Sequence, residues 1–309
     1  MTDSKYHQHL IKELARLKKE RDAFILAHVY QKPEIQDIAD FTGDSLKLAQ
    51  EATSIDAKVI VLCGVLFMAE TVAILNPDKI VLLPAGNAGC PLADAAAVEE
   101  LRIKRSVYPD AAVVSYVNSS AKIKAESDIC CTSSNAVEVV NALKEKQVIF
   151  IPDQNLGQFV ASHTDKQIIL WDGFCYVHHH NIKLKDIRKL QIEHPKAEVI
   201  VHPECQPKVT NIANYVGSSA QMAAYVFRSK CKEFIIGTEI GMTHKLKKEN
   251  PDKFFYIPSL KVCCIDMKLI AIENIIFALQ KMEPQITVPS QVAGEARKSL
   301  ERMLNLSKR

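Results

Sequence analysis

Short apolar runs recur along the chain in a fixed order, and each run ends in polar residues or a turn. The first run of each copy is rich in β-forming residues and lies at 23–31, 111–119 and 197–205. The second run lies at 58–64, 147–153 and 232–239. The third run opens with Asp-Lys, ends at a cysteine, and lies at 78–90, 165–175 and 252–264. Runs of this kind predict β-strands, so the pattern predicts three copies of one structural unit.

Segments with helical spacing follow these strands. A helix is predicted after each third strand, at 91–105, 182–192 and 265–281, and further helices are predicted at 6–20 and 293–306. Strands that alternate with helices form βαβ units with parallel sheets, joined by right-handed crossovers. We therefore predict an α/β fold of three α/β/α sandwich lobes related by a pseudo-threefold axis. The predicted domains are residues 1–108, 109–194 and 195–309, the last with the C-terminal helix.

The three copies stay in register where their first strands end. The same place is occupied by His28, Tyr116 and His202, which lie 88 and 86 residues apart. A serine follows each of them by 17 residues, and these serines are Ser45, Ser133 and Ser219. Ligands of open parallel sheets bind beyond the carboxyl ends of the strands. These positions are therefore predicted to line a site.

Polar residues at these strand ends suit proton transfer and anion binding. The polar side chains that end the first strands are His28, Tyr30, Tyr116, Asn118, His202 and Glu204. Glu204 is the only carboxylate among them, which makes it the best candidate for a general acid or base. The serines that begin helical segments could bind an anion such as phosphate, most clearly at Gly217-Ser218-Ser219, although simple helix capping is the favoured interpretation of any one of them. The run from His178 to His180 is interpreted as solvated surface.

Three of the nine cysteines share the repeat. Cys90, Cys175 and Cys264 end the third strands, and a pseudo-threefold axis would bring them together. Three thiolates are too few for a structural zinc site, but they suit an iron–sulfur cubane with one iron open to substrate. The alternative is that they are small buried apolar residues. Core or surface filling is the favoured interpretation of the remaining cysteines, with Cys263 left open as a substitute for Cys264: Cys63, Cys130, Cys131, Cys205, Cys231 and Cys263.

Composition narrows the classes of function. The 309 residues are 48% hydrophobic and 24% charged, and the net charge of +3 comes without the basic stripe that nucleic-acid binding requires. No run approaches the roughly 20 apolar residues that span a bilayer, and the N-terminus lacks a signal-peptide pattern. We therefore expect a cytoplasmic protein without nucleic-acid or membrane partners. Thiols stay reduced in that compartment, so disulfides are not expected.

Several segments resemble the signature segments of the quinolinate synthase family. They include PEIQDIADF, LLPAGNAGC, PDQNLG, VHPEC, GSSAQM and CIDMK. The resemblance implies three similar lobes around a central [4Fe–4S] cluster, with Cys90, Cys175 and Cys264 as its ligands. The CxxMK match favours Cys264 over Cys263. The implied reaction condenses iminoaspartate with dihydroxyacetone phosphate to give quinolinate, phosphate and water in NAD biosynthesis.

The resemblance also assigns expected roles to individual residues. The groups expected to orient substrate and move protons are Glu204, His202, Tyr30 and Tyr116. The groups expected to bind substrate are His28, Ser45, Asn118, Ser133, Ser218 and Ser219. The open iron is expected to act as a Lewis acid on a substrate hydroxyl or carboxylate. An aspartate oxidase or dehydrogenase that supplies iminoaspartate is the expected functional partner.

Two other functions remain open for a cluster protein. A redox sensor or electron carrier would need a fully ligated cluster and a surface for a partner. A hydro-lyase of the aconitase type would also leave one iron open, but its sequence motifs are missing. Production of quinolinate separates the first function from both of these.

Overall fold

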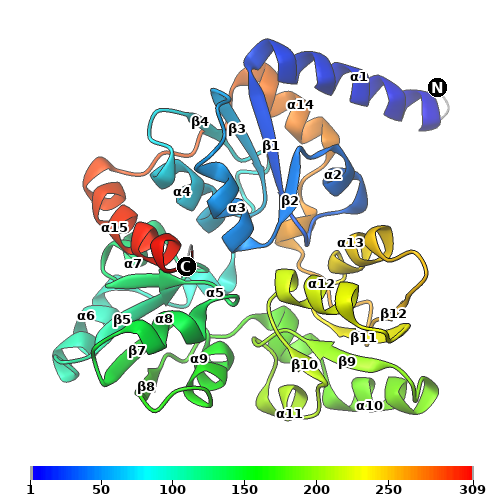
Figure 1. Ribbon diagram of the computed structural model, residues 1–309. Coiled ribbons are helices and arrows are strands. Elements are labelled where there is room, and N and C mark those ends of the chain that lie inside the picture. Colours follow the sequence, from blue (N-terminus) through cyan, green and yellow to red (C-terminus); the bar gives the residue numbers. More distant parts are fainter. Residues whose placement is uncertain (1–2, 308–309) are drawn as a thin grey trace. The chain divides into compact units, whose positions relative to one another are not determined.

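The computed structural model describes residues 3–307 and contains three four-stranded sheets (Figure 1). Their strand orders are β2-β1-β3-β4, β6-β5-β7-β8 and β10-β9-β11-β12. All strand pairs within the sheets are parallel. The predicted α/β fold with three repeated lobes is confirmed.

The three lobes have the same order of elements. The first contains β1 (Ala23–His28), α2 (Pro33–Ile38), β2 (Phe41–Gly43), α3 (Ser45–Ala52), β3 (Val59–Cys63), α4 (Leu66–Leu75) and β4 (Ile80–Leu82). The second contains β5 (Ala112–Tyr116), α7 (Ala121–Ala125), β6 (Ile129–Cys131), α8 (Ala136–Ala142), β7 (Gln147–Ile151), α9 (Gln154–Ala161) and β8 (Gln167–Leu170). The third contains β9 (Glu198–Val201), α11 (Pro207–Thr210), β10 (Tyr215–Val216), α12 (Ser219–Arg228), β11 (Glu233–Gly237), α13 (Met242–Glu249) and β12 (Phe254–Tyr256).

Each lobe has one strand more than the sequence pattern predicts. The segments after the first strands were expected to be helix or turn, and they do hold α2, α7 and α11. They also hold the edge strands β2, β6 and β10, which are only 3, 3 and 2 residues long. A strand of that length is too short to show alternation, and it forms because the neighbouring first strand offers main-chain partners.

The repeat extends to individual hydrogen bonds. In each lobe, a residue near the start of the first strand forms two hydrogen bonds with the residue 15 positions after it. The later residue is an aspartate or an asparagine. Its side-chain oxygen accepts from the earlier residue's main-chain N–H, and its own N–H donates to the earlier residue's carbonyl. The pairs are Ile25 with Asp40, Val113 with Asp128, and Val199 with Asn214. The three lobes are therefore copies at the level of single side chains.

The chain divides into two compact units, and the helices outside the lobes belong to one or the other. Unit 1 comprises Met1–Cys90 and Ile265–Ala293, and unit 2 comprises Pro91–Cys264 and Gly294–Arg309. The elements that lie between or beyond the lobes are α1 (Asp3–Arg21), α5 (Pro91–Asp94), α6 (Val98–Val107), a π-helix (Val177–Asn181), α10 (Leu184–Glu193), a 3₁₀ turn (Asp266–Lys268), α14 (Ile272–Lys281) and α15 (Ser290–Leu306). Within the described residues, no helix is both long and apolar enough to cross a membrane.

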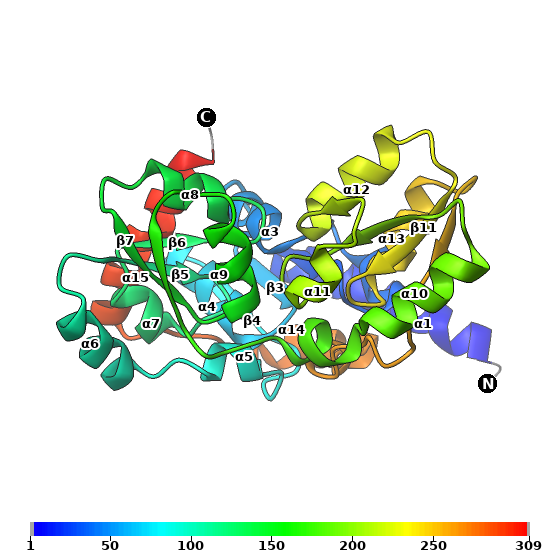
Figure 2. The same cartoon turned by 90° about the horizontal axis from the view of Figure 1, so that it is seen from below.

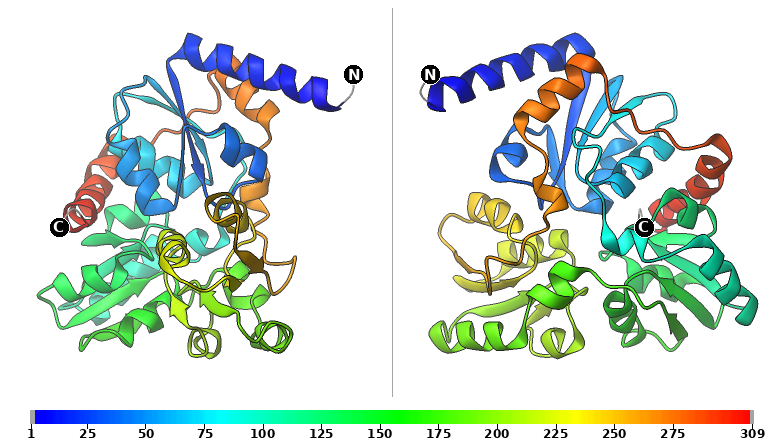
Figure 3. Two further views of the ribbon diagram at one scale, coloured as in Figure 1. Left: turned by 45° about the vertical axis from the view of Figure 1, so that its right-hand side comes forward. Right: turned by 180° about the vertical axis from the view of Figure 1, so that it is seen from behind.

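In unit 1, α1 and α14 lie side by side, as Figure 3 shows. The Arg21 guanidinium at the end of α1 donates hydrogen bonds to the Leu279 and Gln280 carbonyls of α14. The chain after α14 adds a single antiparallel bridge, Leu82 with Gln285, beside β4. A segment more than 180 residues distant in sequence thus completes the first lobe.

In unit 2, α15 lies on the second lobe (Figure 2). The Ser299 hydroxyl donates to the Lys124 carbonyl, and the Asn135 amide donates to the Ser307 hydroxyl. The C-terminal helix therefore packs on the second lobe, although it follows the third in sequence. The domain bounds 1–108, 109–194 and 195–309 stay a prediction; each sheet falls within one of these ranges.

Candidate active site

One main-chain hydrogen bond recurs in front of each cysteine that ends a third run. The N–H of the third residue beyond β3, β7 and β11 donates to a carbonyl two residues before the cysteine. The three bonds are Leu66 to Ala88 (2.9 Å), Gln154 to Gly173 (2.8 Å) and Ile240 to Val262 (2.8 Å). The same bond therefore precedes Cys90, Cys175 and Cys264, and Cys263 lies one residue out of this register.

Two of these cysteines belong to unit 2 and border one core. Cys175 and Cys264 are partly exposed, and both pack against the buried cluster that contains Val201, Cys205 and Val262. Cys90, also partly exposed, belongs to unit 1. The third strands end 8, 5 and 8 residues before Cys90, Cys175 and Cys264, so the three thiols lie in loops and not at the predicted strand ends. Partly exposed thiols are accessible to a metal or cluster, whereas fully buried ones are not.

The remaining cysteines divide as the sequence suggests. The four that are buried are Cys63, Cys130, Cys131 and Cys205. Burial raises the pKa of all four thiols, that of Cys130 to about 11, so they stay protonated core residues. Cys231 and Cys263 are partly exposed. No disulfide joins any cysteine of the described chain.

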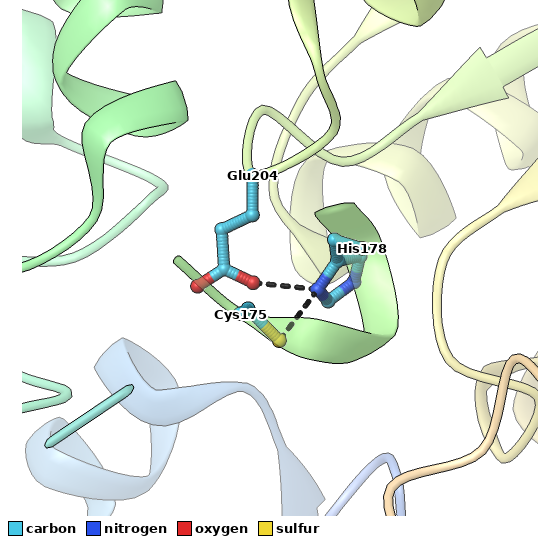
Figure 4. Close-up of side chains that lie close together, drawn as sticks. All are labelled: Cys175, His178 and Glu204. Carbon is cyan, nitrogen blue, oxygen red and sulfur yellow. Dashed lines mark hydrogen bonds and ion pairs between the residues drawn. The ribbon is translucent and has the colours of Figure 1, made fainter. Parts of the chain in front are cut away.

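Cys175, His178 and Glu204 converge in unit 2, and Figure 4 shows their side chains pointing toward one another. Nδ1 of His178 lies 2.6 Å from Oε2 of Glu204 and 3.3 Å from Sγ of Cys175. One ligand atom from each of the three residues lies within 4.8 Å of the other two. A thiol, an imidazole and a carboxylate at this separation form a set that can bind a metal ion or a polar substrate.

The interpretation of the histidine run as solvated surface is wrong for His178. Its side chain is 2% exposed, and its Nε2 lies 2.9 Å from the Thr238 hydroxyl. His179 is half-buried and His180 is exposed. The run forms a π-helix directly after Cys175, and π-helical turns occur frequently at functional sites because they redirect side chains. Proximity to Cys175 was the only signal of this role in the sequence.

His202 extends this group toward the second lobe. Its ring stacks on that of His178 with centroids 4.6 Å apart, and its Nε2 lies 3.1 Å from the Ser133 hydroxyl. Nδ1 accepts a hydrogen bond from the Glu204 N–H, which places the ring proton on Nε2, facing Ser133. Burial lowers the pKa of His202 to about 3, against the opposing effect of Glu204. His202 is therefore neutral near pH 7.

Glu204 is a buried carboxylate with an open oxygen. Burial alone would raise its pKa, but His178 and His202, with a smaller effect of Tyr116, lower the pKa to about 2. Glu204 is therefore ionised near neutral pH. Among residues 3–307, its Oε1 has no hydrogen-bond partner. Buried oxygens rarely stay unsatisfied, so Oε1 marks a place where a ligand can donate.

Asn118 occupies the same place in the second lobe as Glu204 in the third, two residues after the equivalent of His202. Its Oδ1 is the second open buried oxygen of unit 2 within the described residues. Two unsatisfied oxygens at equivalent strand ends indicate a polar ligand at the carboxyl edge of these sheets.

Unit 1 repeats the arrangement with other residues. His28 is buried, and its Nδ1 accepts a hydrogen bond from the Tyr30 N–H at 3.2 Å, as His202 accepts from Glu204. The His28 and Tyr30 rings meet edge to face, 4.5 Å apart. Lys268 donates to the Tyr30 carbonyl. Tyr30 thus takes in the first lobe the place that Glu204 takes in the third.

The serines lie at helix starts, but capping explains only one of them. Ser45 and Ser219 are the first residues of α3 and α12, and the caps are Asp44 and Ser218. Ser218 forms a capping box with Gln221, and it accepts a hydrogen bond from Ser134 at 2.6 Å. Ser133 lies before α8 and contacts His202. Helix capping therefore leaves the roles of Ser45, Ser133 and Ser219 to be explained otherwise.

Three further residues surround the site and were not singled out from the sequence. Asp153 and Glu239 each lie two residues after a second strand, and both are fully buried. The Asn155 amide donates to the Glu204 carbonyl and to Nδ1 of His179, both at 2.9 Å. The equal spacing of Asp153 and Glu239 after β7 and β11 can be seen in the sequence, but acidic residues after strands are too common for it to single them out.

The fold and the site together define an α/β protein whose candidate metal-binding and proton-transfer groups follow the carboxyl ends of its parallel strands. The family model of the quinolinate synthetase A protein matches residues 12–305, and the chain belongs to this family. The chain is 51% identical to quinolinate synthase 2 of Methanosarcina acetivorans over 298 residues. The aligned part covers 96% of this chain and 96% of the relative. It is 51% identical over 299 residues to the quinolinate synthase of Alkaliphilus metalliredigens, which covers 96% of this chain and 98% of the relative. Identity to the quinolinate synthase of Dehalococcoides mccartyi is 51% over 302 residues, which covers 98% of this chain and 100% of the relative.

Proposed function

We propose that the chain condenses iminoaspartate with dihydroxyacetone phosphate to quinolinate, phosphate and water, and that Cys90, Cys175 and Cys264 hold a [4Fe–4S] cluster for this reaction. The chain is a quinolinate synthase of NAD biosynthesis by its family and by its likeness to its relatives over nearly their whole length. The observation that carries the ligand assignment is the main-chain bond that recurs two residues before each of the three cysteines.

The residues present fit such a cluster. The three proposed ligands are partly exposed, whereas four other cysteines are buried as protonated thiols. Cys264 keeps the repeated register and Cys263 does not, which supports Cys264 as the third ligand. When bound, a cluster with three cysteine ligands supplies an iron that can act as a Lewis acid on a substrate hydroxyl or carboxylate.

Glu204 is the proposed proton acceptor. It is ionised, buried and open at Oε1, so a substrate N–H or O–H can donate to it directly. His178 holds the other oxygen, which fixes the orientation of the carboxylate. His202 presents its Nε2–H to Ser133, and a substrate oxygen that replaces the Ser133 hydroxyl would accept a hydrogen bond from it. Tyr30 and Tyr116 are the proposed phenol groups for further proton transfers.

The remaining proposed residues bind substrate. Ser45 and Ser219 open α3 and α12, where main-chain N–H groups and the helix dipole favour phosphate or carboxylate. In unit 2, Ser218 directly precedes Ser219 and accepts a hydrogen bond from Ser134, and Ser133 contacts His202. Asn118 offers an open amide oxygen to a donor, and His28 completes the set in unit 1.

The setting of the reaction is part of the proposal. A compartment that keeps thiols reduced protects such a site, so we place the protein in the cytoplasm. Iminoaspartate must be supplied by an enzyme that oxidises aspartate, and an aspartate oxidase or dehydrogenase is the proposed functional partner.

Anaerobic purification tests the proposal directly. About four irons per chain are expected, together with quinolinate formation from the two substrates. Both should be lost in Cys90→Ala, Cys175→Ala and Cys264→Ala. Cys263→Ala is the matched control, because it removes the adjacent partly exposed thiol, and it should keep both. A cluster without quinolinate would contradict the proposed reaction and favour a redox protein or hydro-lyase.

A further inference from the structure

Two buried carboxyl groups hold the main chain of cysteines in unit 2. Oδ2 of Asp153 accepts a hydrogen bond from the Cys175 N–H at 3.1 Å, and Oδ1 accepts from Leu156 at 2.7 Å. Oε1 of Glu239 accepts from the Cys264 N–H at 3.0 Å, and Oε2 accepts from Gly241 at 2.6 Å. Each carboxyl group thus binds the cysteine with one oxygen and the turn after its own strand with the other.

The two carboxyl groups occupy equivalent places. Asp153 lies two residues after β7 and Glu239 two residues after β11, and both side chains are 0% exposed. Withdrawing a carboxyl group from water is unfavourable unless its oxygens are hydrogen-bonded. Here the compensation comes from main-chain N–H groups, and in both lobes one of them belongs to a proposed ligand.

The approach of the two segments is close. A Cβ atom on Gly173 would lie 2.4 Å from the Pro152 carbonyl oxygen, so only glycine fits two residues before Cys175. The main-chain bond from Gln154 to Gly173 lies at the same point. The cysteine loop is therefore fastened to the end of the second strand by a side chain and by main chain together.

In the first lobe, a carboxyl group also binds the main chain next to the cysteine, but it comes from a different position in the sequence. Its place two residues after β3 holds Val65, which has no carboxyl group. Within unit 1, Oδ1 of Asp266 accepts instead from the Gly89 N–H at 3.1 Å, next to Cys90. A carboxyl group beside each cysteine is thus present in all three lobes, although its position in the sequence differs. The first lobe lacks a carboxyl group two residues after its second strand, yet a carboxyl group still binds the main chain next to its cysteine. This indicates that the cysteine segments themselves need such a hydrogen bond.

We propose that Asp153 and Glu239 are positioning residues that fix the thiols of Cys175 and Cys264 for cluster binding. This inference rests on the proposed function, since it needs the cluster. Cys175 and Cys264 follow irregular segments after β8 and β12, which alone leave the thiol directions loosely determined. Outer groups that hold metal ligands typically contribute 10–100-fold to metal retention. Asp153 and Glu239 act through the main chain of the ligands and do not touch substrate.

Isosteric variants provide the test. In Asp153→Asn and Glu239→Gln, one of the two acceptor oxygens becomes an NH₂ group, while the side-chain volume is kept. After anaerobic purification, the half-life of the cluster absorbance on exposure to air should fall about 10-fold in both variants, and the EPR signal of the reduced cluster should change. In Asp153→Glu and Glu239→Asp both acceptor oxygens remain, and each change installs the residue of the other lobe, so the half-life should stay nearer to that of the unchanged chain.

Asp128→Asn is the matched control. Its carboxylate also accepts a main-chain N–H, that of Val113 at 2.7 Å, and the third lobe carries Asn214 at the equivalent place. This variant should leave the half-life and the EPR signal unchanged. If Asp153→Asn and Glu239→Gln behave like Asp128→Asn, the positioning role is overturned while the cluster stands. If the unchanged chain holds no iron, the proposed function fails, and the positioning role fails with it.

Discussion

Nδ1 of His178 lies 2.6 Å from Oε2 of Glu204, and both side chains are almost fully buried. The short distance places the Nδ1 proton between the two groups, with the imidazole as donor. One oxygen of the carboxylate is thereby occupied and oriented, while Oε1 stays open. A base held in one orientation with one free oxygen is suited to take a proton from a defined position on a substrate.

Glu204→Gln should abolish turnover and leave iron content unchanged. The amide keeps the shape of the side chain but cannot accept a proton, so a loss of about 10²–10⁴-fold in kcat is expected. Quinolinate formation and iron content, measured on one anaerobic preparation, check this. Glu233→Gln is the control, since Glu233 faces His194 at 3.8 Å in a partly exposed pair outside the site. Near-normal turnover of Glu204→Gln would exclude its role in proton transfer.

His178→Asn should shift the pH profile of kcat/KM. His178 is the stronger of the two imidazoles that lower the pKa of Glu204, so its loss raises that pKa from about 2. The ionised form is the active one, and the acid limb of the profile therefore moves to higher pH. His180→Asn, an exposed position in the same π-helix, should leave the profile in place. An unmoved acid limb in His178→Asn would show that Glu204 does not depend on this imidazole.

Acid should destabilise the protein through His202. Its pKa is about 3 in the folded chain, below the ordinary 6.5, so the unfolded chain takes up the proton first. The stability that comes from keeping His202 neutral is fully present above pH 6.5 and is lost as the pH falls toward 3. Between pH 7.5 and pH 5, the free energy of unfolding should fall by about 2 kcal/mol from this group. The depressed pKa of Glu204 acts only below its ordinary 4.5, outside this range.

Chemical denaturation at the two pH values measures the His202 contribution. His202→Asn should remove about 2 kcal/mol of the pH dependence relative to the unchanged chain. Titrating groups that do not interact with His202 are common to both proteins and cancel in the comparison, so Glu204 is the neighbour whose changed pKa has to be taken into account. Equal pH dependence in the two proteins would mean that His202 does not stay neutral in the folded chain.

Two glycine substitutions should have opposite effects. Gly173→Ala forces a Cβ to 2.4 Å from the Pro152 carbonyl oxygen, and it should lower stability by about 1–3 kcal/mol and weaken iron retention. Gly294→Ala meets no atom within 4 Å and lies in α15, so it should raise stability by about 0.5–1 kcal/mol. Thermal unfolding temperatures of both variants give the comparison. A stable Gly173→Ala variant would contradict the close approach described for Cys175.

The strands of the three lobes could be predicted because long apolar runs carry a strong signal. The edge strands β2, β6 and β10 could not, since two or three residues show no alternation and their pairing depends on a neighbour. The packing of α15 on the second lobe could not be predicted either. Its contacts with Lys124 and Asn135 join residues more than 170 positions apart, and no local pattern encodes them.

The candidate site was predictable where a polar residue fell at the same position in each copy of the repeat. Glu204 and His202 end a predicted strand with polar groups, and the structure brings them together with Ser133. His178 was assigned to the surface because a run of three histidines is usually solvated, and its burial follows from the π-helix that turns it inward. Asp153 and Glu239 went unnoticed because acids after strands are common and only the main-chain bonds to Cys175 and Cys264 distinguish these two.

The hydrogen-bonded pairs that span 15 residues show which parts of the three copies agree in length. These pairs and the 17-residue step to each serine are identical in all three lobes, whereas the step from the repeated main-chain donor to the cysteine is 24, 21 and 24 residues. Among these steps, the copies therefore differ in length only in their second half. An inserted or grafted loop should therefore be tolerated better there, between the second strand and the cysteine, than between the residues that the 15-residue pairs join.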